Sequence, residues 1–321
     1  MMRKPAFDLR STCGQPAQRT PSRLSTVPPR VLFAAVAALL FSASGLGARE
    51  VTDQTGRHVN IPDHPRRLIS LAPSITETVY AMGLGDRLVG DTDYCDYPPQ
   101  AKAKPHVGAM LNPSLEKIVA LKPDLVLGTD EANRRETADQ LERLGIPLYG
   151  VTAHSLDETL RSIQDLGRAL EWEAAAEKLV AGLRERAKAV EKRVKGRPEP
   201  KVLFVVWYRP LITVGSQAFI ADVIRRAGGI SISDDLKGEW PHMSLEEVLA
   251  RNPDVILFPQ TEAFAPELEE FRKLAGWRDL PAVKSHRMYS ISETIMRPCP
   301  RLIDALEELA NTLHPEAAKA P

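Results

Sequence analysis

Hydrophobic and polar positions follow two alternating periods along the chain from about Arg67. Apolar runs of strand length, such as RLISLAP and DLVLGT, alternate with stretches whose apolar residues recur every three or four positions, such as PSITETVYAMGLG and ETADQLERLG. Glycine or proline separates most of these segments. This order predicts an α/β fold with mainly parallel sheets, because parallel neighbours need helical crossovers. The helix that begins near Ser74 is predicted to start with a capping box, since Glu77 follows three residues later.

Residues 157–195 break the alternation, because they contain no strand candidate and are rich in Ala, Leu, Glu, Lys and Arg. The pattern predicts one helix to about Leu170 and then one long helix to about Lys195. The long helix carries an apolar stripe, formed by Leu179, Leu183, Ala187, Val190 and Val194. Its heptads are too few for a coiled coil, so a rigid bridge between two lobes fits better.

After GRPEP the alternation resumes. KVLFVVWY and RMYSIS are predicted strands, and FIADVIRRAGG, PELEEFRKLAGW and PRLIDALEELANTL are predicted helices. The fold is therefore expected to be two α/β lobes, each a mainly parallel sheet flanked by helices, joined by one long bridging helix. The predicted parts are a signal peptide (1–48), an N-terminal lobe (49–170), the bridging helix (171–196) and a C-terminal lobe (197–321).

One piece of sequence occurs twice, once in each predicted lobe. LEKIVALKPDLVLG begins at residue 115, and LEEVLARNPDVILF begins at residue 245. Ser114 and Ser244 precede the two helices as expected N-caps. Glu116 and Glu246 then occupy the same place in the first turn of each helix. These two glutamates either serve to cap their helices or present the same acidic group on both lobes.

The first 48 residues differ from the rest in charge and hydropathy. A basic stretch ends at Arg30, and VLFAAVAALLFSASGLGA follows. This layout is typical of a cleaved secretory signal, although the apolar run approaches the length of a membrane anchor. The segment holds six Lys and Arg and one acid, Asp8, so the remaining chain has a net charge of about −5. That acidity gives no sign of a nucleic-acid partner. After cleavage Cys95 and Cys299 remain, which could pair in an oxidising compartment.

No catalytic motif is recognisable. The chain has no phosphate-binding loop, no dinucleotide fingerprint, no nucleophile elbow, no Cys-x-x-Cys pair and no histidines spaced by four residues. We therefore predict no catalytic residues, no bound metal and no catalytic cofactor. An enzyme with an unrecognised site stays the less favoured alternative. Two lobes with a site between them suit the binding of a small-molecule ligand.

The segments from Arg67 to the last helix resemble the helical-backbone class of periplasmic substrate-binding proteins. RLISLAPSITETVYAMGLGDRLVG, NPSLEKIVALKPDLV, the long central helix and WPHMSLEEVLARNPDVIL have the order and spacing of that family. The resemblance implies a monomeric periplasmic protein that delivers cobalamin, haem or an iron-siderophore to the transmembrane subunits of an ABC importer. DYPPQA, the WP dipeptide and SETIMRPCPRL are most similar to members that bind cobalamin. Haem or a siderophore is the alternative ligand.

The resemblance also assigns residues. Glu116 and Glu246 match the carboxylates that dock on the permease subunits, one from each lobe. The implied ligand contacts are Tyr94, Tyr97, Trp207, Tyr208, Trp240, Glu293 and Arg297. Aromatic faces suit a flat macrocycle, but each of these aromatic residues could instead belong to a lobe core. Cys95 and Cys299 fall in loops beside the expected site, where a thiol near the ligand or a bond between the lobes are open options.

Overall fold

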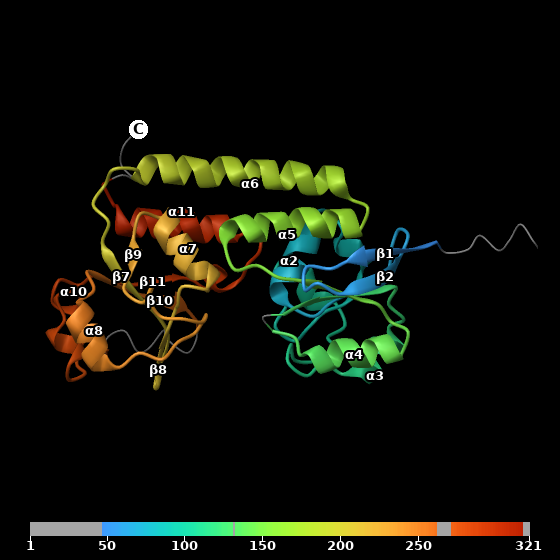
Figure 1. Ribbon diagram of the computed structural model, residues 1–321, viewed down its shortest axis with the longest axis horizontal. Helices are drawn as coiled ribbons and strands as arrows, with labels where there is room; N and C mark the ends of the chain where they lie inside the picture. The colour runs from blue at the N-terminus through green and yellow to red at the C-terminus, as the bar shows by residue number, and fades with distance from the viewer. Residues whose placement is uncertain (1–46, 131, 262–270, 317–321) are drawn as a thin grey trace, which may run out of the picture. The chain divides into compact units, whose positions relative to one another are not determined.

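The computed structural model describes residues 47–130, 132–261 and 271–316 (Figure 1). The predicted signal peptide lies outside these residues except for its last two positions. Among the helices of the described residues, none has the length and apolarity that a bilayer crossing requires.

The first element is a hairpin that the sequence pattern did not predict. Strand β1 (Ala48–Thr52) pairs antiparallel with β2 (His58–Pro62). The turn between them closes the free edge of the N-terminal sheet, where Asp53 Oδ2 accepts a 3.0 Å hydrogen bond from the backbone of Gly150. A Cβ at Gly150 would lie 2.8 Å from Thr55, so only glycine permits this close approach. Burial alone would raise the pKa of Asp53, but hydrogen bonds from Arg57, Thr55 and Gly150 lower it below its ordinary value.

The N-terminal lobe contains a parallel four-stranded sheet in the order β4-β3-β5-β6. Its strands are β3 (Leu68–Ser70), β4 (Leu88–Gly90), β5 (Leu125–Thr129) and β6 (Leu148–Val151). The α-helices are α2 (Pro73–Ala81), α3 (Leu115–Ala120), α4 (Arg135–Arg143) and α5 (Leu156–Ala169), with short 3-10 helices η1 (Gly85–Arg87) and η2 (Ala101–Ala103). Alternate strand residues face opposite layers: Val126 packs with α3 and α4, while Leu125 and Leu127 pack with α2 and α5.

The predicted capping box at the start of α2 is wrong. Pro73 takes the first helical position, and the N-cap is Ala72, which makes no side-chain cap. Ser74 and Glu77 therefore both lie inside the helix. Glu77 is 3% exposed and points to partners from a distant part of the chain. Glu77 therefore forms contacts between distant parts of the chain and does not cap its own helix.

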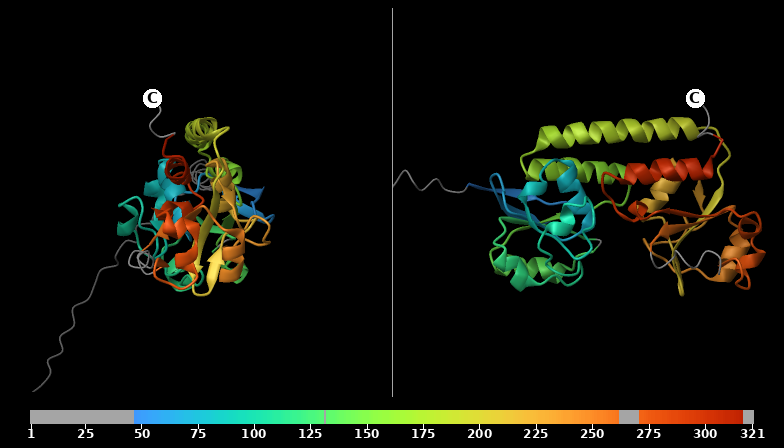
Figure 2. Two further views of the ribbon diagram at one scale, coloured as in Figure 1. Left: turned by 90° about the vertical axis from the view of Figure 1, so that its left-hand side faces the viewer. Right: turned by 180° about the vertical axis from the view of Figure 1, so that it is seen from behind.

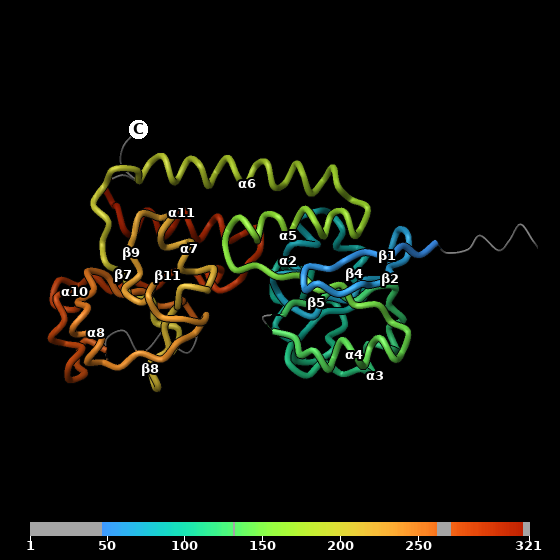
Figure 3. Tube along the Cα trace, in the orientation of Figure 1, coloured from blue at the N-terminus to red at the C-terminus, as the bar shows by residue number. Residues whose placement is uncertain are grey.

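Helix α6 (Glu173–Val194) is the predicted bridge and lies within residues 171–196. It runs without interruption along α5 of the N-terminal lobe and α11 (Leu302–Leu313) of the C-terminal lobe (Figures 2 and 3). Its buried stripe is Ala176, Val180, Leu183, Ala187, Val190 and Val194. Outside this stripe, Arg186 donates hydrogen bonds to Glu307 and Asp304 of α11 at 2.9 and 2.6 Å. The bridge is thus fixed to both lobes by apolar packing, and to the C-terminal lobe also by ion pairs.

The C-terminal lobe has a five-stranded sheet in the order β11-β10-β7-β8, with β9 also paired to β7. All pairs are parallel except β7 with β8. The strands are β7 (Lys201–Tyr208), β8 (Leu211–Thr213), β9 (Ile230–Ser231), β10 (Val255–Gln260) and β11 (Met288–Ser292). The remaining helices are α7 (Phe219–Arg226), α8 (Leu245–Arg251), α10 (Pro281–Lys284), η3 (Trp277–Asp279) and η4 (Glu293–Met296). The first five residues of the predicted helix PELEEFRKLAGW (266–277) lie outside the described residues, and residues 272–276 form turns that lead into η3 rather than a helix.

Both lobes therefore have helices on the two faces of a mainly parallel sheet, as predicted. Helices α7 and α11 cover one face of the C-terminal sheet, and α8 and α10 cover the other. In both lobes the carboxyl ends of the parallel strands lead into loops, which is where sheets of this kind place their ligand sites.

Candidate functional site

The residues assigned to ligand binding follow the carboxyl ends of strands in both lobes. Tyr94 and Tyr97 follow β4, Trp207 and Tyr208 are the last two residues of β7, Glu293 follows β11, and Trp240 lies in the loop before α8. Four of the aromatic residues are exposed rather than buried in a core: Tyr94 (55%), Tyr97 (42%), Trp207 (42%) and Trp240 (39%). Exposed aromatic rings in these loops and strand ends are available to a ligand, so the core alternative is wrong for these four.

Tyr208 differs from its neighbour Trp207. Its ring is half-buried and meets Phe271 edge-on, with 5.2 Å between ring centroids. The two rings are 5.9 Å apart, and the Trp207 indole N–H donates to the carbonyl of Arg209 at 3.0 Å. Successive residues of a strand point to opposite faces. The sequence could not decide which of the two faces the core, and the structure assigns that position to Tyr208.

A buried carboxylate joins the two lobes. Glu77 of α2 accepts two hydrogen bonds from Arg301 (Nε at 2.7 Å and Nη2 at 3.0 Å) and one from Arg297 Nη1 at 2.9 Å. The thiol of Cys299 donates a fourth at 3.2 Å. The Glu77 side chain is 2% exposed, so these bonds replace its water. All of its partners lie between η4 and α11, more than 200 residues away along the chain.

Arg297 is surrounded by acids from both lobes. Besides Glu77 it contacts Asp96 at 2.7 Å and Glu293 at 3.1 Å. We call the group Glu77, Asp96, Glu293, Arg297, Cys299 and Arg301 the Glu77 cluster. Burial would lower the pKa of Arg297, but the hydrogen bonds and charges of Asp96 and Glu77 raise it. Burial would raise the pKa of Asp96, and Arg297 lowers it below its ordinary value. The cluster thus holds Glu293 and Arg297 beside the N-terminal lobe.

Tyr97 lies against the same cluster. The guanidinium of Arg301 stands 3.7 Å from the centre of the Tyr97 ring, which is a cation–π contact. A cavity of about 540 Å³ opens here, lined among others by Tyr80, Tyr97 and Arg301. Sequence analysis missed Arg301 and the true role of Glu77. The four-residue spacing of Arg297 and Arg301 was the only local sign that both could reach one partner.

Further contacts join the lobes away from the Glu77 cluster. His154, after β6, lies 2.9 Å from Glu239, which immediately precedes Trp240. Asp222 of α7 accepts a 2.9 Å hydrogen bond from the backbone of Leu156 at the start of α5. The carboxylate–imidazole pair places the loop that carries Trp240 next to the strand ends of the N-terminal lobe.

Cys95 and Cys299 are free, buried thiols. Cys95 Sγ lies 3.1 Å from the hydroxyl of Thr76, and Cys299 donates to the neighbouring Glu77. Burial raises the pKa of both thiols, and the charge of Glu77 raises that of Cys299 further. The thiols are therefore protonated and contribute to packing and hydrogen bonding in the described structure.

Glu116 and Glu246 are exposed residues in the first turns of α3 and α8. The serine caps are confirmed: Ser114 Oγ accepts from Lys117 at 3.3 Å, and Ser244 Oγ accepts from Glu247 at 3.1 Å. In α8 the capping-box carboxylate is Glu247, not Glu246. Within the described part of the chain, neither Glu116 nor Glu246 makes a side-chain hydrogen bond or ion pair. Capping does not explain them.

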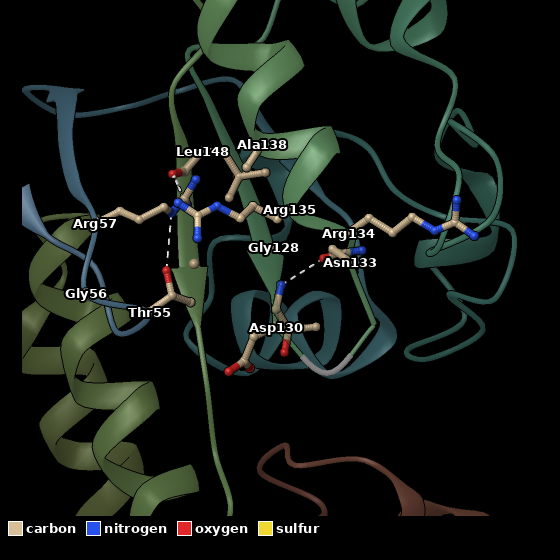
Figure 4. A pocket seen from close by; sticks show the side chains of 12 residues that line it. Thr55, Gly56, Arg57, Gly128, Asp130, Asn133, Arg134, Arg135, Ala138 and Leu148 are labelled. Carbon is tan, nitrogen blue, oxygen red and sulfur yellow. Dashed lines mark hydrogen bonds between the residues drawn. The ribbon is translucent and has the colours of Figure 1, made fainter.

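A separate cavity of about 450 Å³ lies on the flank of the N-terminal lobe, between the hairpin turn and the start of α4 (Figure 4). Arg57 and Arg135 point into it, while Arg134 points away. Arg57 is already paired with Asp53 at 2.7 Å and donates to the carbonyl of Leu148. None of the residues assigned to ligand binding lines this cavity.

Comparison with known proteins is consistent with this geometry. The sequence matches the periplasmic binding protein family over residues 68–294. It is 34% identical over 278 residues to the uncharacterized ABC transporter substrate-binding lipoprotein YvrC of Bacillus subtilis, covering 84% of this chain and 86% of that protein. The vitamin B12-binding protein BtuF of Vibrio cholerae has a similar structure, with a TM-score of 0.71, 30% identity, and 80% and 99% of the two chains covered. The heme-binding protein RhuT of Roseiflexus is similar too, with a TM-score of 0.71, 29% identity, and coverage of 78% and 99%. These matches span most of the chain, which belongs to the periplasmic binding protein family.

Proposed function

We propose that this chain is the binding component of an ABC importer and that its ligand is cobalamin or a close corrinoid. The observation that carries the proposal is the set of exposed aromatic rings at strand ends and in loops of both lobes, with contacts that join the lobes nearby. Trp207 and Trp240 come from the C-terminal lobe, and Tyr94 and Tyr97 from the N-terminal lobe. Rings from two sides can cover a large macrocycle, and similarity to BtuF supports this ligand class.

The ligand is bound without chemical change, and the protein acts as a monomer after export and removal of residues 1–48. Glu293 and Arg297 would contact polar groups at the edge of the ligand. Because Arg297 is already held by carboxylates, it would present a fixed guanidinium rather than a mobile one. Helix α6 and the Glu77 cluster keep the lobe movement small on ligand binding, since bending a continuous helix breaks hydrogen bonds that a loop hinge would not.

Isothermal titration calorimetry of the mature chain tests the ligand. We expect tight binding of cyanocobalamin and weaker or absent binding of haemin and ferric siderophores. Trp207→Ala and Trp240→Ala should each reduce cyanocobalamin affinity by about tenfold, as buried aromatic contacts at binding sites commonly do. Ile230→Ala, an exposed residue of β9, is the matched control and should bind like the unchanged chain. Haemin binding without cyanocobalamin heat would overturn the corrinoid assignment and leave the transport proposal intact.

Haem is the second candidate, and Tyr94 favours it. A phenol that is 55% exposed beside the site can act as an axial ligand of haem iron. If haem is the ligand, Tyr94→Phe should change the visible spectrum of the haemin complex and weaken it. If the spectrum stays the same, Tyr94 is not the iron ligand.

The permease is proposed to contact Glu116 and Glu246. A carboxylate in a first helical turn is stabilised by the helix dipole and can accept a bidentate arginine contact. Glu116→Arg and Glu246→Arg should abolish uptake in cells while ligand affinity stays unchanged, because like charges would then face each other. Uptake that survives both substitutions, or affinity that collapses with them, contradicts the docking role.

A further inference from the structure

The two copies of the repeated segment share the serine cap, one buried aliphatic residue and a left-handed residue after the helix. Each helix begins at a capping serine and places one fully buried aliphatic residue on the lobe core, Ile118 in α3 and Val248 in α8. After the helix, Lys122 and Asn252 both adopt a left-handed conformation, with φ of 48° and 49°. These residues make the helix and its exit, so packing and capping account for them.

The aspartates of the two copies also have the same structural role. Asp124 Oδ2 accepts from the backbone of Arg67 at 2.8 Å, just before β3. Asp254 Oδ2 accepts from the backbone of Lys201 at 2.8 Å, at the start of β7. Each aspartate therefore ties the repeat to the first parallel strand of its lobe, which is again a requirement of the fold.

Two exposed positions of the repeat are not explained in this way. One is the glutamate pair Glu116 and Glu246. The other is an aliphatic pair, Val119 (44% exposed) and Leu249 (40% exposed). Each aliphatic residue follows its glutamate by three positions, so the two side chains are neighbours on one helix face. Single exposed apolar residues are common. Here they occupy the same position in both copies, next to the same carboxylate.

Solubility favours neither aliphatic residue, because an exposed apolar side chain gains nothing from water. Helix stability does not favour Val119 either, since valine is a weaker helix former than lysine or glutamate, whereas leucine at position 249 is a good helix former. Exposed Ala120 and Ala250 follow them, so a small side chain flanks each aliphatic residue. A partner surface could therefore approach the helix closely at the same place in each lobe. Helices α3 and α8 both lie on the side of their lobes away from α6 (Figures 1 and 2).

We infer that each lobe docks on its partner through a two-residue contact, a glutamate and the aliphatic residue one turn later. The inference rests on the proposed docking function and extends it to the apolar half of the contact. The complementary surface has a basic side chain for the carboxylate, bordered by an apolar depression for Val119 or Leu249. Because the contact occurs twice in the same form, the partner presents the same surface twice, as two copies of one transmembrane subunit would.

Binding of the mature chain to its importer tests the inference. The importer of the same organism, with its transmembrane and ATPase subunits in lipid nanodiscs, is immobilised for biolayer interferometry. Val119→Ser and Leu249→Ser should each weaken binding about fivefold, the size expected for the loss of one partly buried aliphatic contact. The double variant should show about the product of the two effects, since distant sites act independently. Leu144→Ser and Ile230→Ser, at other exposed aliphatic positions, are the controls and should bind like the unchanged chain.

Salt dependence separates the two halves of the contact. Substituting Glu116 or Glu246 with Gln should reduce the dependence of binding on ionic strength, whereas the serine variants should leave that dependence unchanged. If the serine variants bind like the unchanged chain while Glu116→Arg and Glu246→Arg abolish binding, this inference fails and the docking proposal stands. If only one serine variant is impaired, the inference of two equivalent contacts fails. If the unchanged chain does not bind the importer, the docking proposal itself fails.

Discussion

Replacing Glu77 with glutamine should destabilise the protein strongly, although the two side chains have almost the same shape. The side chain of Glu77 is 2% exposed, and it is the only carboxylate bonded to Arg301 among the described residues. Removing one partner of a buried ion pair costs about 3–5 kcal/mol, because the remaining charge stays poorly solvated.

The structure places the expected loss near the lower end of that range. Arg297 keeps its bonds to Asp96 and Glu293, and the side chain of Arg301 is 25% exposed and can recover some water. We therefore expect a loss of about 3 kcal/mol in the free energy of unfolding. For a mature chain of about 270 residues that corresponds to a fall in Tm of about 5 °C.

Thermal and guanidinium unfolding of the mature chain, followed by circular dichroism, measures this loss. Glu293→Gln is the matched control, because Glu293 also bonds Arg297 but its side chain is 41% exposed. That substitution should cost less than about 1 kcal/mol, as exposed ion pairs do. The reasoning is refuted if Glu77→Gln changes Tm by no more than Glu293→Gln does.

Three other predictions concern single positions in the fold. Gly167→Ala should destabilise the protein by about 1–2 kcal/mol in the same unfolding assay, because a Cβ there would overlap the Cβ of Ala176 on α6. Gly182→Ala has open space around it and should instead stabilise the protein by about 0.5–1 kcal/mol. Burial raises the pKa of Asp91 from 3.8 to about 6, although the hydrogen bond and charge of His106 lower it. The folded state therefore binds this proton more tightly than the unfolded state, and the resulting stabilisation is lost as pH rises from about 4 to 6. Asp91→Asn should therefore flatten the pH dependence of unfolding by up to ~3 kcal/mol across that window, and an unchanged slope would contradict the assignment. Ser244→Ala should cost about 1 kcal/mol through loss of the capping box while leaving ligand affinity unchanged, and a drop in affinity would argue for a wider role of α8.

The sequence alone determined the order and type of most elements. Helices such as α6 and strands such as β5 and β10 depend on periodicity and on caps within a few residues, and these are local properties. The serines before α3 and α8 were identifiable for the same reason, since a cap is bonded three residues away. The duplicated segment, and with it the matching positions of Glu116 and Glu246, is likewise visible without a structure.

Only the tertiary structure decided which side chains meet across the lobes. Ser74 and Glu77 fit a local capping pattern, but Pro73 starts the helix, and the partners of Glu77 lie more than 200 residues away. A carboxylate buried in one lobe pairs with the nearest guanidinium groups, because a buried charge without a partner is strongly destabilising. Spacing along the sequence carries no information about which guanidinium groups are near in space. The same holds for Trp207 and Tyr208. Both are aromatic, and their packing in the folded lobe, including the contact of Tyr208 with Phe271, decides which ring is half-buried and which is exposed at the strand end.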